Sequence, residues 1–221
     1  MLFVAALAYG AYFFIVELGR VPDGTAGLAP VVLADAGLFL LFAGHHSVMA
    51  REPAKRWLVQ HVPPHLERSV FVWTASLLFL LMCLAWRPVP GQAWRLSDPW
   101  VWVARVVQAA GVLVTVLSVR LLDALVIAGI RHVETAASAE PPAMSIAGPY
   151  RLVRHPIYLG WVLMVAATPH MTAGRLLFAL LSVGYLVIAI PWEERALQRE
   201  FGEAYRSYQA QVRWRVIPGV Y

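Results

Sequence analysis

The sequence has 221 residues, of which 60% are hydrophobic and only 14% are charged, and its net charge is +5. Soluble domains carry about 25% charged residues, so an ordinary water-soluble fold is excluded and membrane-embedded helices are expected. The basic residues stand in polar segments between apolar runs rather than on a face interleaved with aromatic residues, which argues against a nucleic-acid partner.

Six apolar segments predict an all-α polytopic transmembrane bundle that forms a single domain over residues 1–221. Four transmembrane helices are expected within residues 1–130, a cytoplasmic loop over 131–155, a helical hairpin over 156–191, and a cytoplasmic helix and tail over 192–221. The segments run from Leu2 to Leu18, Val31 to Met49, Val70 to Trp86, Trp100 to Ile130, Pro156 to Ala167 and Ala173 to Ile190.

The fifth segment is short for a membrane crossing, because 12 helical residues reach only about 18 Å. It is followed by the turn-like residues 168–172, which contain the helix breaker Pro169. The fifth and sixth segments are therefore predicted to form a tight helical hairpin.

The distribution of Lys and Arg predicts that both termini face the cytoplasm. Twelve basic residues fall in segments assigned to that side: Arg51, Lys55, Arg56, Arg68, Arg131, Arg151, Arg154, Arg195, Arg199, Arg206, Arg213 and Arg215. Four fall on the other side: Arg20, Arg87, Arg95 and Arg175. The expected location is a bacterial inner membrane.

The sequence Gly-Pro-Tyr-Arg-Leu-Val-Arg-His-Pro-Ile-Tyr-Leu-Gly over 148–160 gathers polar side chains where the fifth helix begins. Pro156 suits the first turn of a helix, and a helix N-terminus offers unpaired N–H groups and partial positive charge. Gly160 allows close approach to the helix backbone. Arginines for lipid headgroups and tyrosines for the aromatic belt would explain the same residues.

A second polar group, Trp192-Glu193-Glu194-Arg195, follows the sixth apolar segment. One interpretation of these carboxylates is a helix that enters water, with Glu194 paired to Gln198 or Arg195 facing the solvent. The predicted hairpin instead brings them beside His155, and a carboxylate, a histidine and two tyrosines below an apolar bundle indicate a ligand site.

Two more features carry titratable groups. His45 and His46 are adjacent, so they point to different faces of a helix and make a poor metal pair, and no metal site is expected. His46 is either a packed histidine or a functional one. Arg120 and Asp123 lie one helical turn apart in the fourth segment, where a structural ion pair and a functional site are both consistent with the spacing.

These motifs resemble the isoprenylcysteine carboxyl methyltransferase superfamily, through residues 148–160, Glu193-Glu194, and Phe201-Gly202-Glu203-Ala204-Tyr205-Arg206-Ser207-Tyr208. The N-terminal half resembles the bacterial methanethiol S-methyltransferase branch. Its matching stretches are His46-Ser47-Val48-Met49-Ala50-Arg51, Lys55-Arg56-Trp57, Val62-Pro63-Pro64 and Glu67-Arg68-Ser69, with Gly160-Trp161 and 167–172 further on.

The resemblance implies a methyltransferase that binds S-adenosyl-L-methionine on the cytoplasmic side. It assigns cofactor contacts to Tyr150, His155, Pro156, Ile157, Tyr158 and Glu193, and a further strip to residues 142–145. Arg154, Gly160 and Glu194 of the same two motifs are expected to contribute to the cofactor site, and Trp161, Arg120 and Asp123 to the substrate site. His46 is the candidate general base, with His155 as the alternative and an unassisted thiol as a third reading.

Two positions bear on the methyl acceptor. Ala189 stands where carboxyl-methylating eukaryotic members have an arginine, which argues against a prenylcysteine carboxylate. The thiol-methylating branch has an aspartate near the position of Val126, and Asp123 is the nearest counterpart here. A small or apolar thiol is therefore the expected acceptor, and prenylcysteine carboxyl O-methylation the alternative.

Other classes compete with a methyltransferase. A membrane reductase on a similar scaffold and a membrane protein linked to nitric oxide metabolism are alternatives. A transporter would show repeats and broken mid-membrane helices, which the sequence lacks. The expected partners are a thiol or lipophilic small molecule and membrane lipid, with no obligate protein partner.

Overall fold

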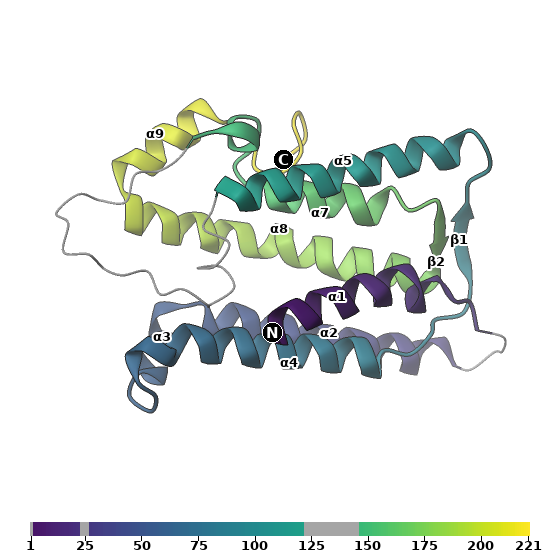
Figure 1. The fold of residues 1–221 in the computed structure, drawn as a ribbon, viewed down its shortest axis with the longest axis horizontal. Coiled ribbons are helices and arrows are strands. Elements are labelled where there is room, and N and C mark those ends of the chain that lie inside the picture. The colour runs from purple at the N-terminus through teal and green to yellow at the C-terminus, as the bar shows by residue number, and fades with distance from the viewer. Residues whose placement is uncertain (1, 23–26, 122–145) are drawn as a thin grey trace. The chain divides into compact units, whose positions relative to one another are not determined.

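A computed structural model of the protein describes residues 2–22, 27–121 and 146–221. Figure 1 shows long α-helices and a single pair of short strands among these residues. The all-α class is confirmed. The chain divides into two compact units: one holds the described residues of 1–95 together with 170–181, and the other holds the described residues of 96–169 together with 182–221.

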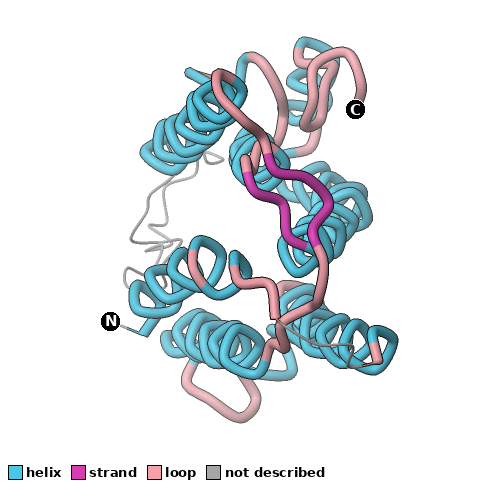
Figure 2. Tube along the Cα trace, turned by 90° about the vertical axis from the view of Figure 1, so that its right-hand side faces the viewer, coloured by secondary structure: helices cyan, strands magenta, loops and turns pink. Residues whose placement is uncertain are grey.

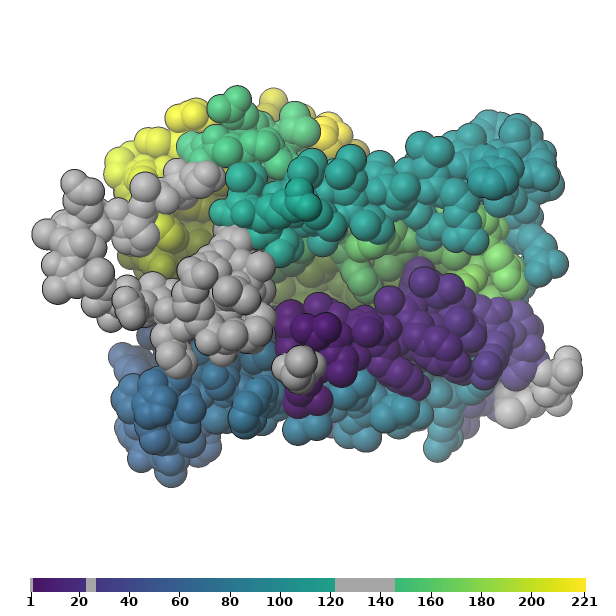
Figure 3. Space-filling model, in the orientation of Figure 1, coloured from purple at the N-terminus to yellow at the C-terminus, as the bar shows by residue number. Residues whose placement is uncertain are grey.

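The first unit is built on three long helices. Pro53 and Pro64 stand in the first turns of the short helices α3 and η2, where their missing N–H groups have no helical partner to lose. Both α1 and α2 pack against α4, and Figure 3 shows the side chains of α1 lying on those of α4. The elements are α1 (Leu2–Ile15), η1 (Glu17–Gly19), α2 (Leu28–Met49), α3 (Glu52–Leu58), η2 (Pro64–Leu66), α4 (Glu67–Ala85), β1 (Gln92–Arg95), β2 (His170–Thr172) and the start of α8 (Ala173–Phe201).

Four aromatic rings form the core of this unit. Phe178 of α8 makes edge-to-face contacts with Phe13, Phe39 and Trp86 at centroid distances of 5.8, 6.2 and 5.6 Å. All four side chains are more than nine-tenths buried. Edge-to-face pairs of this kind stabilise by about 0.5–1.5 kcal/mol beyond burial, so this cluster fixes α1, α2 and α4 around the start of α8.

The expected tight turn after the fifth apolar segment is instead a short strand. His170–Thr172 pairs antiparallel with Gln92–Arg95, with a bulge between Gln92 and Trp94, and Figure 2 shows the two strands side by side. Pro169 prevents the helix from continuing, and the ladder then supplies partners to backbone groups. Arg175, just inside α8, donates to the carbonyls of Phe14 and Ile15 at the end of α1.

The second unit contains α5 (Trp100–Leu121), η3 (Gly148–Arg151), α7 (Pro156–Ala166), the rest of α8, and α9 (Glu203–Gln211). α5 and α7 pack closely where two glycines face each other. A Cβ atom on Gly160 would lie 2.2 Å from Thr115 Oγ1 and 2.6 Å from the Gly111 carbonyl oxygen. Small residues allow such backbone approach between membrane helices, so α7 is anchored along α5.

Five helical segments among the described residues have the length and composition to cross a membrane: Leu2–Gly19, Leu28–Met49, Pro64–Ala85, Trp100–Leu121 and Ala173–Phe201. The predicted fifth segment is the shorter apolar helix Pro156–Ala166. The sixth segment continues beyond its predicted end at Ile190, since α8 runs through Pro191 to Phe201. The helix stops before Gly202, whose φ of 55° favours glycine. The predicted continuation of the fourth segment to Ile130 lies outside the described residues.

Candidate functional site

The helical hairpin places the start of α7 beside the second half of α8, as the sequence predicts. His155 is non-helical, with φ −122° and ψ 66°, and α7 begins at Pro156 immediately after it. Residues that precede proline avoid helical conformations, which explains why the chain turns into the helix at this point. The imidazole of His155 then lies within 4 Å of both Glu193 and Glu194 on α8.

Glu193 lies on the more open side of this group. Its Oε2 accepts a hydrogen bond of 2.9 Å from the Tyr158 hydroxyl and lies 3.7 Å from His155 Nδ1. The rings of His155 and Tyr158 stack with centroids 5.3 Å apart and planes 3° from parallel. The Glu193 side chain remains 43% exposed, so this carboxylate is held in place and is still accessible to a ligand.

Glu194, the next residue, is buried and paired. Its Oε1 accepts from Arg154 Nε at 2.7 Å, its Oε2 accepts from Arg215 Nε at 3.1 Å, and His155 Nε2 lies 3.4 Å from Oε1. The residue is 4% exposed. The alternative of a solvated Glu194 paired to Gln198 is therefore wrong, and Gln198 donates instead to Gln209. We call Arg154, His155, Tyr158, Glu193, Glu194 and Arg215 the carboxylate cluster.

Arg154 is also used within the protein. Besides its bond to Glu194, its Nη1 donates to the carbonyl oxygens of Val212 at 2.8 Å and Arg213 at 2.7 Å. Its side chain is only 9% exposed. Arg154 was predicted to contact the cofactor. Its guanidinium already donates to three acceptors of the protein itself.

Tyrosines border the carboxylate cluster. The Tyr208 hydroxyl donates to the Tyr150 carbonyl at 2.8 Å, which ties α9 to the segment before α7. Burial, and then the charge of Glu193, raise the pKa of the Tyr150 phenol to about 12. Burial likewise raises the pKa of Tyr205 and of Tyr208, so all three phenols stay neutral at physiological pH.

Two of the predicted contacts on α7 face other helices. The backbone at Gly160 faces α5, and the Trp161 indole N–H donates to the buried Ser182 hydroxyl at 3.1 Å. Pro156 is buried and Ile157 is half-buried in the first turn, next to His155. The close approach predicted at Gly160 is thus made by a helix of the protein, while Trp161 joins α7 to α8.

The remaining predicted residues belong to elements other than α7 and α8. His46 belongs to α2 in the first unit, packs on Phe71 with ring centroids 5.4 Å apart, and has a buried Nδ1 without a hydrogen-bond partner among the described residues. Arg120 is exposed in the last turn of α5. Asp123, Val126 and the predicted strip at 142–145 lie outside the described residues, so the Arg120–Asp123 pair stays a prediction.

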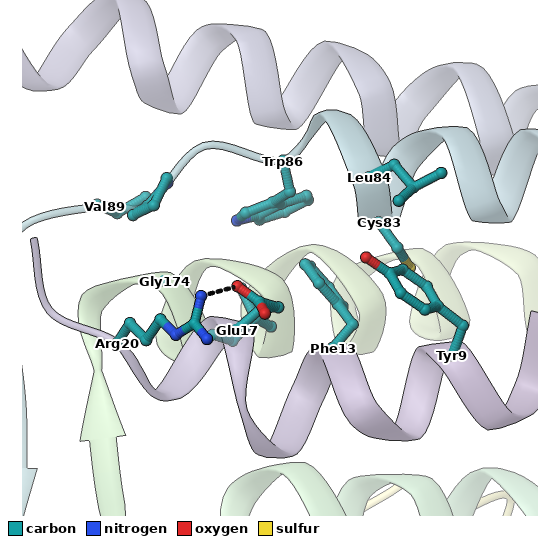
Figure 4. Close-up of a pocket in the computed structure, with 11 residues that line it drawn as sticks. Tyr9, Phe13, Glu17, Arg20, Cys83, Leu84, Trp86, Val89 and Gly174 are labelled. Carbon is teal, nitrogen blue, oxygen red and sulfur yellow. Dashed lines mark hydrogen bonds and ion pairs between the residues drawn. The ribbon is translucent and has the colours of Figure 1, made fainter.

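A pocket in the first unit shares no residue with the carboxylate cluster. Its walls come from α1, the end of α4 with the residues after it, and the start of α8, and it encloses about 440 Å³ including its open mouth. Figure 4 shows the ion pair of Arg20 with Glu17 at one end and the side chain of Cys83 at the other. It lacks the convergent polar groups of the carboxylate cluster.

The sequence predicts a cytoplasmic tail but does not predict that Arg215 in this tail contacts Glu194. Arg215 was counted only as a basic residue on the cytoplasmic side. Burial disfavours its charge, but Glu194 and Tyr221 outweigh that effect and raise the pKa of its guanidinium above the usual value. Nothing in the spacing of the tail indicates a contact with Glu194, 21 residues away.

Comparison with known proteins places these observations in a family. The phospholipid methyltransferase family matches residues 102–204. Methanethiol S-methyltransferase 2 of Bradyrhizobium diazoefficiens is 36% identical over 96% of this chain and 88% of its own length. Methanethiol S-methyltransferase of Mycobacterium tuberculosis is 36% identical over 96% of this chain and 90% of its own.

A more distant relative is nurim of Bos taurus, 32% identical over 73% of this chain and 66% of its own length. No solved structure matches the chain. These relatives confirm the resemblance drawn from the motifs over nearly the whole sequence. The described residues also include five helical segments that are long and apolar enough to cross a membrane. The chain therefore belongs to the methanethiol S-methyltransferase family of integral membrane methyltransferases.

Proposed function

We propose that the protein binds S-adenosyl-L-methionine at the carboxylate cluster and transfers its methyl group to the sulfur of a small or apolar thiol such as methanethiol. The observation that carries the proposal is Glu193, a 43% exposed carboxylate fixed by the Tyr158 hydroxyl next to the start of α7. The names of the relatives support methanethiol as the acceptor.

The residues present fit this cofactor. A sulfonium cation is favoured by carboxylates and by aromatic faces, and Glu193, Tyr158 and Tyr150 offer both. The Glu193 side chain is partly exposed, so a ligand can reach it, whereas the neighbouring carboxylate of Glu194 is buried between two arginines. Glu193, Tyr158, His155 and the N-terminal turn of α7 at Pro156 and Ile157 would hold the cofactor.

When bound, S-adenosyl-L-methionine supplies a methyl group on a positively charged sulfur, which a thiolate can attack in line. The residues of the protein have to align the two groups and exclude water, since opposite charges neutralise in the transition state. The Tyr158 hydroxyl orients Glu193, and the His155 ring, stacked on Tyr158, lies 3.7 Å from the same carboxylate oxygen. No covalent intermediate with a side chain is required.

The thiol proton needs an acceptor, and the two candidates differ in their surroundings. His155 is 7% exposed, and its ring nitrogens lie 3.7 and 3.4 Å from the carboxylates of Glu193 and Glu194, so its imidazole already contacts two side chains of the carboxylate cluster. The Nδ1 of His46 has no hydrogen-bond partner among the described residues, which leaves it able to accept one. His46 is therefore our proposed base.

An apolar thiol also suits the residues of α8 better than a carboxylate substrate does. Ala189, one turn before Glu193, offers no positive charge, and a buried carboxylate without a partner costs several kcal/mol. A thiol without charged groups carries no such penalty. Asp123, Arg120 and Trp161 remain the proposed residues on the substrate side, with Trp161 acting from the α7–α8 contact.

We further propose that the protein lies in the inner membrane with both termini in the cytoplasm, as the twelve basic residues on that side predict. Reporter fusions after Arg20, after Arg95 and at Tyr221 should read outside, outside and inside. A C-terminus that reads outside would contradict this orientation.

The function is tested by incubating membranes with methyl-labelled S-adenosyl-L-methionine and a panel of thiols, sulfides and prenylcysteines. We expect labelled thioether from a small thiol, and weaker binding of S-adenosylhomocysteine by Glu193→Ala, by about 1–3 kcal/mol. Glu203→Ala is the matched control, because that carboxylate is exposed on α9 and pairs only locally with Arg206. Faster methylation of a farnesylcysteine carboxylate than of every thiol would refute the proposed acceptor.

A further inference from the structure

The C-terminal residues 212–221 lie along the segment that leads into α7, and we call them the strap. Two backbone hydrogen bonds join the segments: Arg154 N–H donates to the Trp214 carbonyl at 2.9 Å, and His155 N–H donates to the Arg215 carbonyl at 2.8 Å. These bonds end directly before Pro156. The strap thus supports the backbone of the two residues whose side chains reach Glu194.

The strap is folded on itself around Tyr221. The backbone N–H groups of residues 215, 216 and 217 all donate to the main-chain oxygen of Tyr221, at 3.0, 2.8 and 3.0 Å. The Arg215 guanidinium lies 5.1 Å from the centre of the Tyr221 ring, and its Nη1 donates to the phenol oxygen at 3.2 Å. Arg215 therefore leaves the strap in a defined direction, toward Glu194.

A proline in α8 provides a contact for the strap. Pro191 has no N–H, so the carbonyl of Val187, one turn earlier, lacks its usual helical partner. The Tyr221 hydroxyl lies 3.5 Å from this oxygen. The kink-prone site of the helix is thus bridged by the strap two residues before Glu193.

The two oxygens of the buried Glu194 carboxylate contact residues from two different segments of the chain. Oε1 faces Arg154 and His155, which belong to the segment before α7, and Oε2 faces Arg215 of the strap. Without Arg215, Oε2 would keep no hydrogen-bond partner among the described residues, and the carboxylate could rotate away from His155. His155 stacks on Tyr158, and Tyr158 holds Glu193.

We propose that Arg215 is a positioning residue for the cofactor site: through Glu194 and His155 it fixes the orientation of Tyr158 and Glu193. This inference rests on the proposed function, since it assigns the cofactor to Glu193. It predicts that the strap affects the affinity for the cofactor and leaves recognition of the thiol unchanged.

The test compares Arg215→Gln, Arg215→Lys and the control Arg213→Gln in the full-length purified protein. Arg213 stacks on Trp214 in the same strap, is exposed, and gives Arg154 only its backbone carbonyl, which the substitution keeps. Calorimetry measures the Kd for S-adenosylhomocysteine, steady-state kinetics measure KM for each substrate and kcat, and a thermal melt measures the Tm.

We expect Arg215→Gln to weaken cofactor binding about tenfold, the scale of one charged hydrogen bond, while KM for the thiol stays within about twofold. Arg215→Lys keeps the charge without the planar fork and should fall between Gln and the wild type. Arg213→Gln should match the wild type. If Arg215→Gln does not fold, Tyr221→Phe should still raise the Kd in the same direction by a smaller factor.

The possible failures are distinguishable. A wild-type protein that binds no S-adenosylhomocysteine would refute the proposed function and this inference together. A wild-type protein that binds it, with Arg215→Gln binding equally well or with both KM values rising in parallel, would refute the positioning role alone. In that case Arg215 would be a general stabilising residue, visible in the Tm.

Discussion

The contact between α5 and α7 gives a quantitative test of the structure at Gly160. In Gly160→Ala the new Cβ atom would lie 2.2 Å from Thr115 Oγ1, 2.6 Å from the Gly111 carbonyl oxygen and 3.2 Å from the Thr115 nitrogen. Two of these three atoms belong to the α5 backbone. No rotamer change relieves them, so α7 has to move away from α5.

The magnitude follows from two opposing effects. Replacing glycine by alanine within a helix stabilises by about 1 kcal/mol, whereas overpacking a tight contact costs about 1–3 kcal/mol, and here the obstruction is backbone. Because backbone atoms cannot move aside as a side chain can, we take the upper part of that range, about 2–3 kcal/mol, and expect a net loss of about 1–2 kcal/mol in the free energy of unfolding. Because α7 carries Tyr158, affinity for S-adenosylhomocysteine should fall as well.

The matched control is Gly184→Ala in α8, where a Cβ atom would meet nothing within 4 Å. Thermal unfolding in one detergent, followed by tryptophan fluorescence, should show Gly184→Ala at or above the wild-type Tm and Gly160→Ala below it. Adding Thr115→Ala removes the shortest contact but leaves the Gly111 carbonyl, so it should rescue only in part. Equal melting of the two glycine variants would refute the close packing of α5 on α7.

Three further outcomes are expected. Arg175→Met should lower unfolding stability by about 1–3 kcal/mol, because three carbonyl oxygens lose a charged donor, and equal Tm values would count against this cap. Trp161→Phe removes the 3.1 Å bond to Ser182 and should cost about 0.5–1.5 kcal/mol in the same melt, with no loss if the indole N–H is unimportant. The pKa of the Tyr150 phenol is raised from 10.0 to about 12, so the folded state favours the neutral phenol. The contribution of this phenol to the free energy of unfolding is therefore fully present below pH 10 and is lost as the pH rises toward 12. Phenolate absorbance should accordingly show a late-titrating tyrosine that Tyr150→Phe removes, and an unchanged titration would contradict its burial.

The sequence predicts most of the fold because membrane helices are signalled by composition. The starts of the helices at Trp100 and Pro156 and the end at Met49 agree with the structure, since each is marked by an abrupt change from polar to apolar residues or by a proline. The strand at His170–Thr172 could not be predicted, because three residues give no periodicity and their partners in the ladder lie 75 to 80 residues earlier.

The convergence of His155 with Glu193 and Glu194 was predictable once the two helices were recognised, because a hairpin of two adjacent helices brings its outer ends together. The pairing of Arg154 with Glu194 was not predicted, because an arginine at a membrane boundary is already explained by lipid headgroups. Arg215 was missed because its role depends on how residues 212–221 fold back, and that depends on Tyr221 and on the carbonyl exposed by Pro191.

The two adjacent glutamates show how helical geometry divides one residue type between two roles. Successive residues on an α-helix point about 100° apart, so Glu193 and Glu194 cannot face the same surroundings. Glu194 turns to Arg154 and Arg215, and two positive charges make its burial tolerable. Glu193 contacts the Tyr158 phenol and the His155 imidazole, and no arginine or lysine pairs with it among the described residues. A cationic ligand would supply a positive charge there, which is why we propose Glu193 rather than Glu194 as the residue for a sulfonium cofactor.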